Sequence, residues 1–517
     1  MKKLLIVDFG SQYTQLIANV IRKLKVFCEV IPYNRLSVAV TFDSSICGII
    51  LSGGPYSVTE ITYPNVSFED LLDKNIPILG ICYGAQLIAK NFGGKVEKTN
   101  GEYGNTKTKI EYTGNTVYNE KIYLQDKIIE DINEMYVWMS HNDTIIEVPK
   151  DWEVFSKTEN GKIAMFGNSK LKYYGIQFHP EVSHTKYGNK ILSNFTKICN
   201  CENEWTEQNF IDRCVKDIQR KVDKNGVIMA LSGGVDSTVA AFLIHKAIKE
   251  RLHCVVVNNG YMRKGEYEEI LKNCKDFGMN VEGVDASDIF YRNMYGITDP
   301  EAKRKIIGRV FVDIFSSISK KYDNIKYLGQ GTIYPDVIES VSGKGKIKSH
   351  HNVAGLPKDM DLELLEPLRI LFKDEVRSVG KQLNIPLSII MRHPFPGPGL
   401  SIRILGEATK KNTIVLQNAD KIFIDKLIEH GLYKNIWQAG AIYLPIKTVG
   451  VMGDLRTYEN VIALRAVESI NGMTADWYDF RKEFLSEVSN KIINEVEGVN
   501  RVVYDISSKP PATIEWE

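Results

Sequence analysis

The 517-residue sequence lacks a long apolar run. Its apolar stretches fall well short of the roughly 20 residues that a membrane-spanning helix needs. Near the N-terminus, Asp8 interrupts a short apolar segment before it reaches the length of a signal peptide. We therefore expect a soluble, intracellular protein located in the cytoplasm.

The sequence also lacks an excess of either charge. Lys and Arg together number 65, against 64 for Asp and Glu. Such a balance provides no overall basic field to attract nucleic acid or an anionic membrane. We expect small molecules as partners, with neither nucleic acid nor a membrane among them.

Paired cysteines with the spacing of a metal site are missing as well. Eight cysteines are scattered along the chain, and the nearest two, Cys199 and Cys201, are separated by one residue. In a long intracellular chain this distribution favours reduced thiols over disulfides or a dedicated metal site.

The chain is long enough for two or three domains. Short apolar runs, such as residues 4–7, 48–51 and 76–81, alternate with amphipathic stretches, which is typical of parallel strands joined by helices. A polar stretch at 200–207 indicates a linker, and the Pro- and Gly-rich residues 393–399 cannot form a helix or a central strand. We predict three domains, at residues 1–203, 204–392 and 393–517.

Cys82 is a candidate nucleophile. It follows the apolar run 76–81 and precedes a helix-like segment, with Gly80 and Gly84 to relieve crowding at the turn. A helix N-terminus and a nearby histidine favour the reactive thiolate. His179 and Glu181 lie downstream as a base and its orienting acid.

When Cys82 attacks a carbonyl group, the carbonyl oxygen becomes negatively charged and needs hydrogen-bond donors to stabilise it. Backbone N–H groups of Tyr83 and of Gly54, in the turn at 52–55, are the natural oxyanion donors. Taken alone, a cysteine is more often a small buried apolar residue, and a lone histidine is more often structural. The combination with glycine turns favours the catalytic interpretation.

A glycine-rich segment after the predicted strand 227–231 is a candidate phosphate loop. Its backbone N–H groups and hydroxyls can converge on phosphate oxygens at a helix N-terminus. A Walker A loop is excluded, because no Gly-Lys-Ser/Thr ending is present. The alternative is a bare glycine turn that caps the helix through Ser232 or Asp236. The candidate residues are Ser232, Gly233, Gly234, Val235, Asp236, Ser237 and Thr238.

Residues 80–86 and 178–181 resemble the class I glutamine amidotransferases. The resemblance implies that Cys82 attacks the side-chain amide of glutamine, that His179 protonates the departing ammonia and later activates water, and that Glu181 holds His179. It also implies that glutamine is bound by Gln86, Asn142 and Asp143, although Asn142 stands where a glycine is common.

The loop at 232–238 resembles that of the ATP pyrophosphatases. These enzymes cleave ATP between its α and β phosphates and leave AMP on a substrate oxygen. The resemblance implies ATP as a substrate, Lys373 as a phosphate contact, and Mg²⁺ bound with the pyrophosphate, with Asp236 as a candidate contact to the ion.

Further segments, from 329–336 to the terminal 508–517, resemble the family of glutamine-hydrolysing GMP synthases along essentially the whole chain. This implies a flavodoxin-like amidotransferase sheet, a doubly wound parallel-sheet ATP pyrophosphatase and a small α/β dimerisation domain in a homodimer. ATP would adenylylate the C2 oxygen of xanthosine monophosphate (XMP), and ammonia would displace AMP to give GMP. The implied XMP-binding residues are Arg309, Gln438, Lys509, Ile514 and Glu515, and the implied lid residues are Asp336, Glu339 and Lys348.

The chain departs from the family pattern at Asn258, where an aspartate is usual, and at Leu455 and Ala354, where glycines are common. Two other functions compete with this one. Another ATP-dependent amidating or thiolating enzyme with the same loop, for example one that modifies tRNA, would need a basic surface or paired cysteines, which are missing. A non-catalytic scaffold would not need the intact cysteine, histidine and glutamate set.

Overall fold

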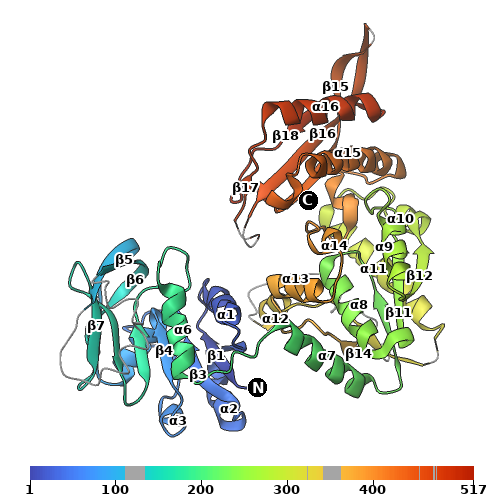
Figure 1. Ribbon diagram of the computed structural model, residues 1–517. Coiled ribbons are helices and arrows are strands. Elements are labelled where there is room, and N and C mark those ends of the chain that lie inside the picture. Colours follow the sequence, from blue (N-terminus) through green and yellow to red (C-terminus); the bar gives the residue numbers. More distant parts are fainter. Residues whose placement is uncertain (111–133, 323, 342–361, 453, 470–471, 473) are drawn as a thin grey trace. The chain divides into compact units, whose positions relative to one another are not determined.

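The computed structural model describes the chain except for residues 111–133, 323, 342–361, 453, 470–471 and 473. The chain divides into two compact units, Met1–Asn209 and Phe210–Glu517 (Figure 1). None of the helices in the described part has the length and apolarity that crossing a membrane requires.

The first unit is built on a nine-stranded sheet in the order β2-β1-β3-β4-β9-β8-β7-β5-β6. One half is parallel: β1 (Lys3–Asp8), β2 (Cys28–Pro32), β3 (Ile46–Leu51), β4 (Ile78–Ile81) and β9 (Tyr173–Ile176). The other half is antiparallel: β5 (Lys95–Ile110), β6 (Glu134–Glu147), β7 (Glu153–Thr158) and β8 (Ile163–Asn168). The sequence did not predict this antiparallel half.

Helices cover the parallel half. They are α1 (Thr14–Lys23), α2 (Leu36–Phe42), α3 (Glu69–Leu72), α4 (Tyr83–Asn91) and α6 (Gly188–Ile198). The parallel strands carry continuous apolar side chains because both faces are covered, and Leu4, Ile50 and Leu79 are fully buried. All parallel strands end at one edge of the sheet, and the turn from β4 into α4 lies at that edge.

The second unit begins with a five-stranded parallel sheet in the order β12-β11-β10-β13-β14. Its strands are β10 (Gly226–Ala230), β11 (Leu252–Asn258), β12 (Asn280–Asp285), β13 (Ile325–Gly329) and β14 (Glu363–Leu365). Its helices are α7 (Glu207–Val222), α8 (Val235–Ile248), α9 (Glu266–Asp276), α10 (Ser287–Asn293), α11 (Pro300–Ser319), α12 (Tyr334–Val341), α13 (Lys373–Gln382) and α14 (Leu387–Ile390). The strand order reverses beside β10, where ligands of doubly wound sheets bind.

The C-terminal part of this unit is a second, mostly antiparallel sheet. It consists of β15 (Gln438–Met452), β16 (Leu455–Glu468), β17 (Asp476–Trp477) and β18 (Val499–Tyr504), with α15 (Lys410–Glu429) and α16 (Lys482–Glu495) packed against it. Of residues 393–399, which the sequence predicts to form neither helix nor central strand, 393–398 have no regular structure, while Gly399 begins the short 3-10 helix η5 (Gly399–Arg403). The predicted α/β class is confirmed in both units.

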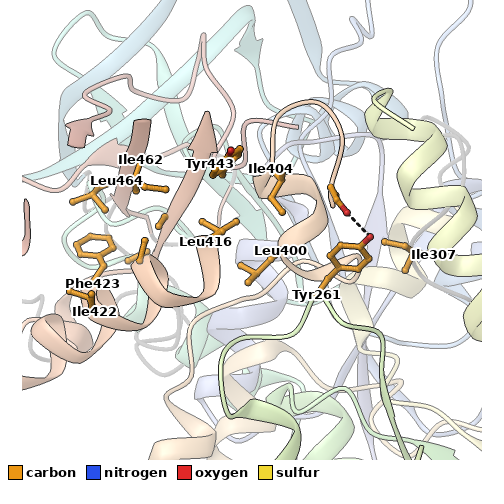
Figure 2. Packing of buried hydrophobic residues seen from close by; sticks show 14 of the residues in the cluster. Tyr261, Ile307, Leu400, Ile404, Leu416, Ile422, Phe423, Tyr443, Ile462 and Leu464 are labelled. Atoms are coloured by element: carbon orange, nitrogen blue, oxygen red, sulfur yellow. Dashed lines mark hydrogen bonds between the residues drawn. The ribbon is translucent and has the colours of Figure 1, made fainter. Parts of the chain in front are cut away.

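A continuous apolar core joins the two sheets of the second unit. Figure 2 shows it passing from Tyr261 and Ile307 through Leu400 and Ile404 to side chains of the C-terminal sheet, among them Ile462. The hydroxyl of Tyr261 is buried here and donates to the carbonyl oxygen of Ala408 at 2.9 Å. The phosphate loop and the C-terminal sheet are therefore parts of one packed body.

Candidate active site

A strained turn presents Cys82 between β4 and α4. Its backbone has φ of +51° and ψ of −103°, a conformation that costs energy for a residue with a side chain. A Cβ atom on Gly80 would lie 2.5 Å from the carbonyl carbon of Gly84, and one on Gly84 would overlap the carbonyl oxygen of Leu51. Only glycine fits at either position, so strand, turn and helix pack tightly around the thiol.

His179 and Glu181 follow β9, the strand next to β4. The Nδ1 atom of His179 lies 2.8 Å from Oε1 of Glu181, and both side chains are almost completely buried. The backbone N–H of His179 donates to the carbonyl oxygen of Trp138, and the Thr185 hydroxyl donates to the carbonyl of His179. These contacts fix the direction of the imidazole.

The charge of His179 is set by its neighbours. Burial alone would lower the pKa of His179, but the negative charge of Glu181 and hydrogen bonds with Cys82 and Glu181 raise it to about 10. The imidazole is therefore held as the cation beside the sulfur. The structure brings the three residues of the predicted triad, Cys82, His179 and Glu181, together.

Sequence reasoning missed two further groups at the sulfur. The side-chain amide of Gln177 points its Nε2 at Sγ of Cys82, at 3.8 Å, and the carbonyl oxygen of Ser140 lies 3.6 Å from the same sulfur. Gln177 precedes the His179 segment directly, which is a usable signal. Ser140 lies on β6, far away in sequence, and nothing in the motif indicates it.

The predicted glutamine-binding residues separate into two groups. Gln86 is buried on α4 and donates from Nε2 to the carbonyl oxygen of Asp143 at 3.0 Å. Asp143 is also buried and accepts a hydrogen bond from Ser57, while its Oδ1 has no hydrogen-bond partner among the described residues. Asn142 points the other way, because successive side chains alternate along β6, and it is exposed and bonded to Tyr103.

The predicted oxyanion donors lie in turns beside Cys82. Tyr83 is the first residue of α4, so its N–H has no acceptor within the helix. Gly54 follows β3 in a turn that packs on Phe9, where a Cβ atom would come within 2.8 Å of the Phe9 carbonyl oxygen. The neighbouring Gly53 would carry a Cβ 3.7 Å from that of Cys82. Both N–H groups therefore belong to turns close to the thiol.

The phosphate loop turns tightly at the carboxyl end of β10. Gly233 has φ of +74°, and a Cβ atom there would meet Ile270 and Arg392. The hydroxyls of Ser232 and Ser237 lie 3.1 Å apart, and those of Ser237 and Thr238 donate to the carbonyl of Gly234. Hydroxyls and the N-terminus of α8 therefore gather at the sheet edge, as the sequence predicts.

Lys373 reaches the same loop from α13. Its Nζ lies 2.6 Å from Oδ2 of Asp236, and both side chains are about one third exposed. The other oxygen, Oδ1 of Asp236, is buried without a hydrogen-bond partner among the described residues. The ammonium group of Lys373 and the carboxylate of Asp236 therefore lie at the N-terminus of α8, and Oδ1 of Asp236 can accept a further contact.

A cavity of about 290 Å³ opens beside this loop. The loop residues Ser232, Asp236 and Ser237 form one side, and Phe311 and Phe315 of α11 form another. The predicted lid residue Asp336 also lines the cavity, where its carboxylate accepts from the N–H of Ile333 at the start of α12. The side chain of Glu339, as well as Lys348 and Ala354, lies outside the described residues.

The C-terminal tail is held by buried cations. Arg403 binds the carboxylate of Glu515 with two hydrogen bonds, at 2.9 and 2.7 Å, and Gln438 binds the same carboxylate. Arg465 donates to carbonyl oxygens at Ser507 and Thr513, and lies 3.4 Å from that of Ile514. Sequence reasoning missed both arginines.

Of the predicted XMP-binding residues, the structure brings Gln438, Ile514 and Glu515 together and not the other two. Lys509 donates to the carbonyl oxygen of Gly472 at 2.7 Å, and Arg309 is exposed on α11. At the family departures, Asn258 uses its side-chain oxygen to accept from the N–H of Gly260, and Leu455 is exposed at the start of β16.

Replacing Glu181 with Gln should remove the charge that raises the pKa of His179. The pKa of His179 is higher in the folded protein, about 10, than the ordinary value of 6.5. The imidazolium–Glu181 contact therefore contributes its full stability below about pH 6.5 and loses it as the pH rises through about 10. Urea unfolding should thus show a larger loss of stability in Glu181→Gln near pH 6 than near pH 10. Glutamine hydrolysis should fall by roughly 10²- to 10⁴-fold. Glu29→Gln, at the half-exposed partner of Lys3, should leave glutamine hydrolysis unchanged, and an unchanged hydrolysis rate in Glu181→Gln would contradict the assignment.

Comparison with known proteins gives three family matches in chain order. Residues 5–199 match the class I glutamine amidotransferases, residues 207–322 match NAD synthase, and residues 425–516 match the GMP synthase C terminal domain. The first match contains Cys82, His179 and Glu181, and the second contains the phosphate loop.

Curated relatives match over the full length. The chain is 53% identical to the glutamine-hydrolysing GMP synthase of Cytophaga hutchinsonii over 521 residues, which span all of both chains. It is 51% identical to that of Porphyromonas gingivalis over 520 residues, again with full coverage of both. It is 50% identical to that of Aquifex aeolicus over 521 residues, which cover 100% of this chain and 99% of the relative. The chain therefore belongs to the family of glutamine-hydrolysing GMP synthases.

Proposed function

We propose that this chain makes GMP from XMP at two centres, with Cys82 releasing ammonia from glutamine and the loop at 232–238 binding the ATP that activates XMP. The buried contact of His179 with Glu181 beside the strained Cys82 carries the proposal, since a purely structural cysteine needs neither. The phosphate loop, at the switch point of a separate sheet, supports the second half of the proposal, the binding of ATP.

In the glutaminase half, the thiolate of Cys82 attacks the side-chain carbonyl carbon of glutamine. The N–H groups of Tyr83 and Gly54 bind the oxyanion that forms. The cationic His179 gives its proton to the amide nitrogen, ammonia leaves, and a thioester to Cys82 remains. Now neutral, His179 takes a proton from water, which attacks the thioester and releases glutamate.

The buried groups around Cys82 define where glutamine binds. Gln86 and Asp143 face the same side as the thiol, and Oδ1 of Asp143 is available to accept from the substrate's ammonium group. Asn142 contributes through its backbone position only, since its side chain faces away.

In the synthetase half, the C2 oxygen of XMP attacks the α phosphate of ATP and pyrophosphate leaves. Serine and threonine hydroxyls of the loop, the N-terminus of α8 and Lys373 bind the phosphates. Phe311 and Phe315 line the same cavity and offer apolar faces to the adenine. Ammonia then attacks C2 of the adenylylated base and AMP departs.

The loop also fits a magnesium ion. The buried Oδ1 of Asp236 lacks a partner among the described residues, and oxygen atoms of carboxylates and hydroxyls are the donors that Mg²⁺ prefers. Asp236 would hold the ion, with Ser237 as a second oxygen donor nearby. When bound, Mg²⁺ would neutralise charge on the pyrophosphate.

The remaining assignments follow from this scheme. Gln438, Ile514 and Glu515 form the part of the XMP site that the tail completes, and we assign Arg309 and Lys509 to it by resemblance. The lid assigned to Asp336, Glu339 and Lys348 begins at α12, beside the ATP cavity. We place the domain boundaries at 203/204 and 392/393 and the protein in the cytoplasm, where stable structural disulfides are rare.

Cys82→Ala should abolish GMP formation with glutamine, by more than about 1,000-fold, and leave formation with ammonium salts near the wild-type rate. The thiol is needed only to release ammonia. Rates are measured from AMP or GMP produced with XMP, ATP and Mg²⁺. Cys214→Ala, at a buried thiol on α7, is the matched control and should retain both activities.

Asp236→Asn tests the other centre in the same assay. Loss of its charge should lower both the glutamine-dependent and the ammonia-dependent rates, while Asp217→Asn on the exposed face of α7 should lower neither. If Cys82→Ala lost both activities, or Asp236→Asn only the glutamine-dependent one, the two-centre scheme would be wrong.

Glu515→Gln should weaken XMP binding by about tenfold, as expected for losing one charge-assisted contact of about 1.4 kcal/mol. Arg403 would then hold the tail through a neutral group only. The KM for XMP should rise while the KM for ATP and glutamine hydrolysis without nucleotide stay unchanged. Glu497→Gln, at an exposed glutamate after α16, should not alter the KM for XMP.

We propose that the chain forms a homodimer through the β15–β16 hairpin. The far end of this hairpin extends beyond α15 and α16 (Figure 1) and exposes the apolar side chains Ile446, Val449, Val451, Leu455 and Tyr458. An exposed apolar cluster of this kind marks an association surface. A second copy is the partner that matches the family's dimerisation domain.

Charged residues on this hairpin should separate the copies. Val451→Asp with Leu455→Asp should shift the mass measured by light scattering from dimer to monomer, because a carboxylate cannot be buried unpaired in the contact. Lys410→Asp, at the exposed start of α15, is the control for added negative charge. A wild-type chain that is monomeric at micromolar concentration would refute the proposal.

A further inference from the structure

Two cysteines outside both centres meet in the first unit. Cys47 lies near the start of β3, and Cys201 follows α6. They are 154 positions apart in sequence, yet their sulfur atoms lie 3.2 Å from each other. Both residues are half-buried, so a small oxidant can reach them, and all eight cysteines of the chain are free thiols in the structure.

The backbone on each side holds the two sulfurs in place. Sγ of Cys47 donates to the carbonyl oxygen of Lys3 on the neighbouring strand, at 3.3 Å. The N–H of Cys201 donates to the carbonyl of Thr196 at 3.1 Å, which fixes it at the end of α6. A disulfide needs the sulfurs to close to about 2.05 Å. From 3.2 Å the two sulfurs need to approach by only about 1 Å.

We propose that Cys47 and Cys201 are a modification site, where a small disulfide such as oxidised glutathione converts the two thiols into a reversible Cys47–Cys201 disulfide. The thiolate of one cysteine attacks a sulfur of the oxidant and forms a mixed disulfide, releasing one thiol. The thiolate of the other attacks the protein sulfur of that mixed disulfide and releases the second. Two protein thiols are oxidised and one disulfide is reduced to two thiols.

The neighbouring Cys199 is not the partner. It is almost completely buried, and its sulfur packs on Gly48 so closely that a Cβ atom there would overlap it. Cys199 instead affects the chemistry of the pair. A hydrogen bond with Cys199 raises the pKa of Cys201, and a hydrogen bond with Cys201 together with burial raises that of Cys47, while Lys2 opposes both changes. Both thiols are therefore protonated at neutral pH.

The bond would lie at the edge of the sheet opposite Cys82. β3 and β4 are parallel, so the start of β3 and the end of β4 are at opposite edges. Cys201 stands in the short segment between the amidotransferase match, which ends at 199, and the NAD synthase match, which begins at 207. The disulfide would tie this connecting segment to the sheet without entering the glutamine site.

The test is peptide mapping of the full-length protein after incubation with oxidised glutathione at about pH 8.5, where more thiolate is present. Free thiols are alkylated, and trypsin digestion without reductant follows. Cys47 lies in the peptide 36–74, and Cys199 and Cys201 share the peptide 198–213. These two peptides should be found linked, and a reducing agent should separate them.

Matched variants identify the sulfurs. The link should persist in Cys199→Ser and disappear in Cys47→Ser and Cys201→Ser, while Cys254 and Cys274, both buried in the second unit, should remain alkylatable after unfolding. The oxidised wild-type chain should also melt at a higher temperature than the reduced chain, because the bond closes a long loop, and Cys47→Ser should show no such shift. Absence of the linked peptides in the wild type, or their persistence in Cys201→Ser, would overturn the proposal.

Discussion

The crowded turn from β4 into α4 is the constraint on which the first centre depends. The strand, the turn and the first helical residues pack with no room for a side chain at Gly80 or Gly84, and Cys82 between them has a positive φ of +51°. This strain is stabilised by the buried parallel strands on either side. Because those strands end at one edge, the same packing that holds the thiol also brings His179 from β9 to it.

The environment of His179 shows how burial and charge compete. Removal from water penalises the imidazolium, yet Glu181 is close enough that the pKa of His179 rises. A histidine held as a cation beside a sulfur can protonate a leaving nitrogen, and it becomes a base only after giving up that proton. The order of the chemical steps thus follows from the local electrostatics.

Sequence reasoning predicted what short segments encode. The two short segments that carry Cys82 and His179, the phosphate loop and most of the irregular stretch at 393–399 each depend on neighbours within a few residues, and glycine and proline positions identify them. It could not predict the antiparallel half of the first sheet. Apolar and polar residues do not alternate clearly in the sequences of β5 and β6, because both faces of these strands carry polar residues. The contact between the Ser140 carbonyl oxygen and the Cys82 sulfur joins segments far apart in sequence, as do the hydrogen bonds of Arg403 to Glu515, and no local signal reports such contacts.

The second unit places buried cations where they hold the end of the chain. Lys303 is fully buried and donates to the carbonyl oxygens of Ser401 and Ile404 and to the carboxylate of Glu517, and burial lowers its pKa even though Glu517 opposes this. Arg403 is equally buried and is held between Glu515 and Asp420. Removing these cations from water costs more free energy than burying apolar side chains of the same size. Their presence indicates that the placement of Glu515 and Glu517 matters more here than stability. Arg403 holds Glu515 beside Gln438 and so fixes the end of the chain.

The continuous apolar core links the C-terminal sheet to the sheet that carries the phosphate loop. One body thus contains both the loop at 232–238 and the tail, whereas the first unit has its own core and its own strained turn.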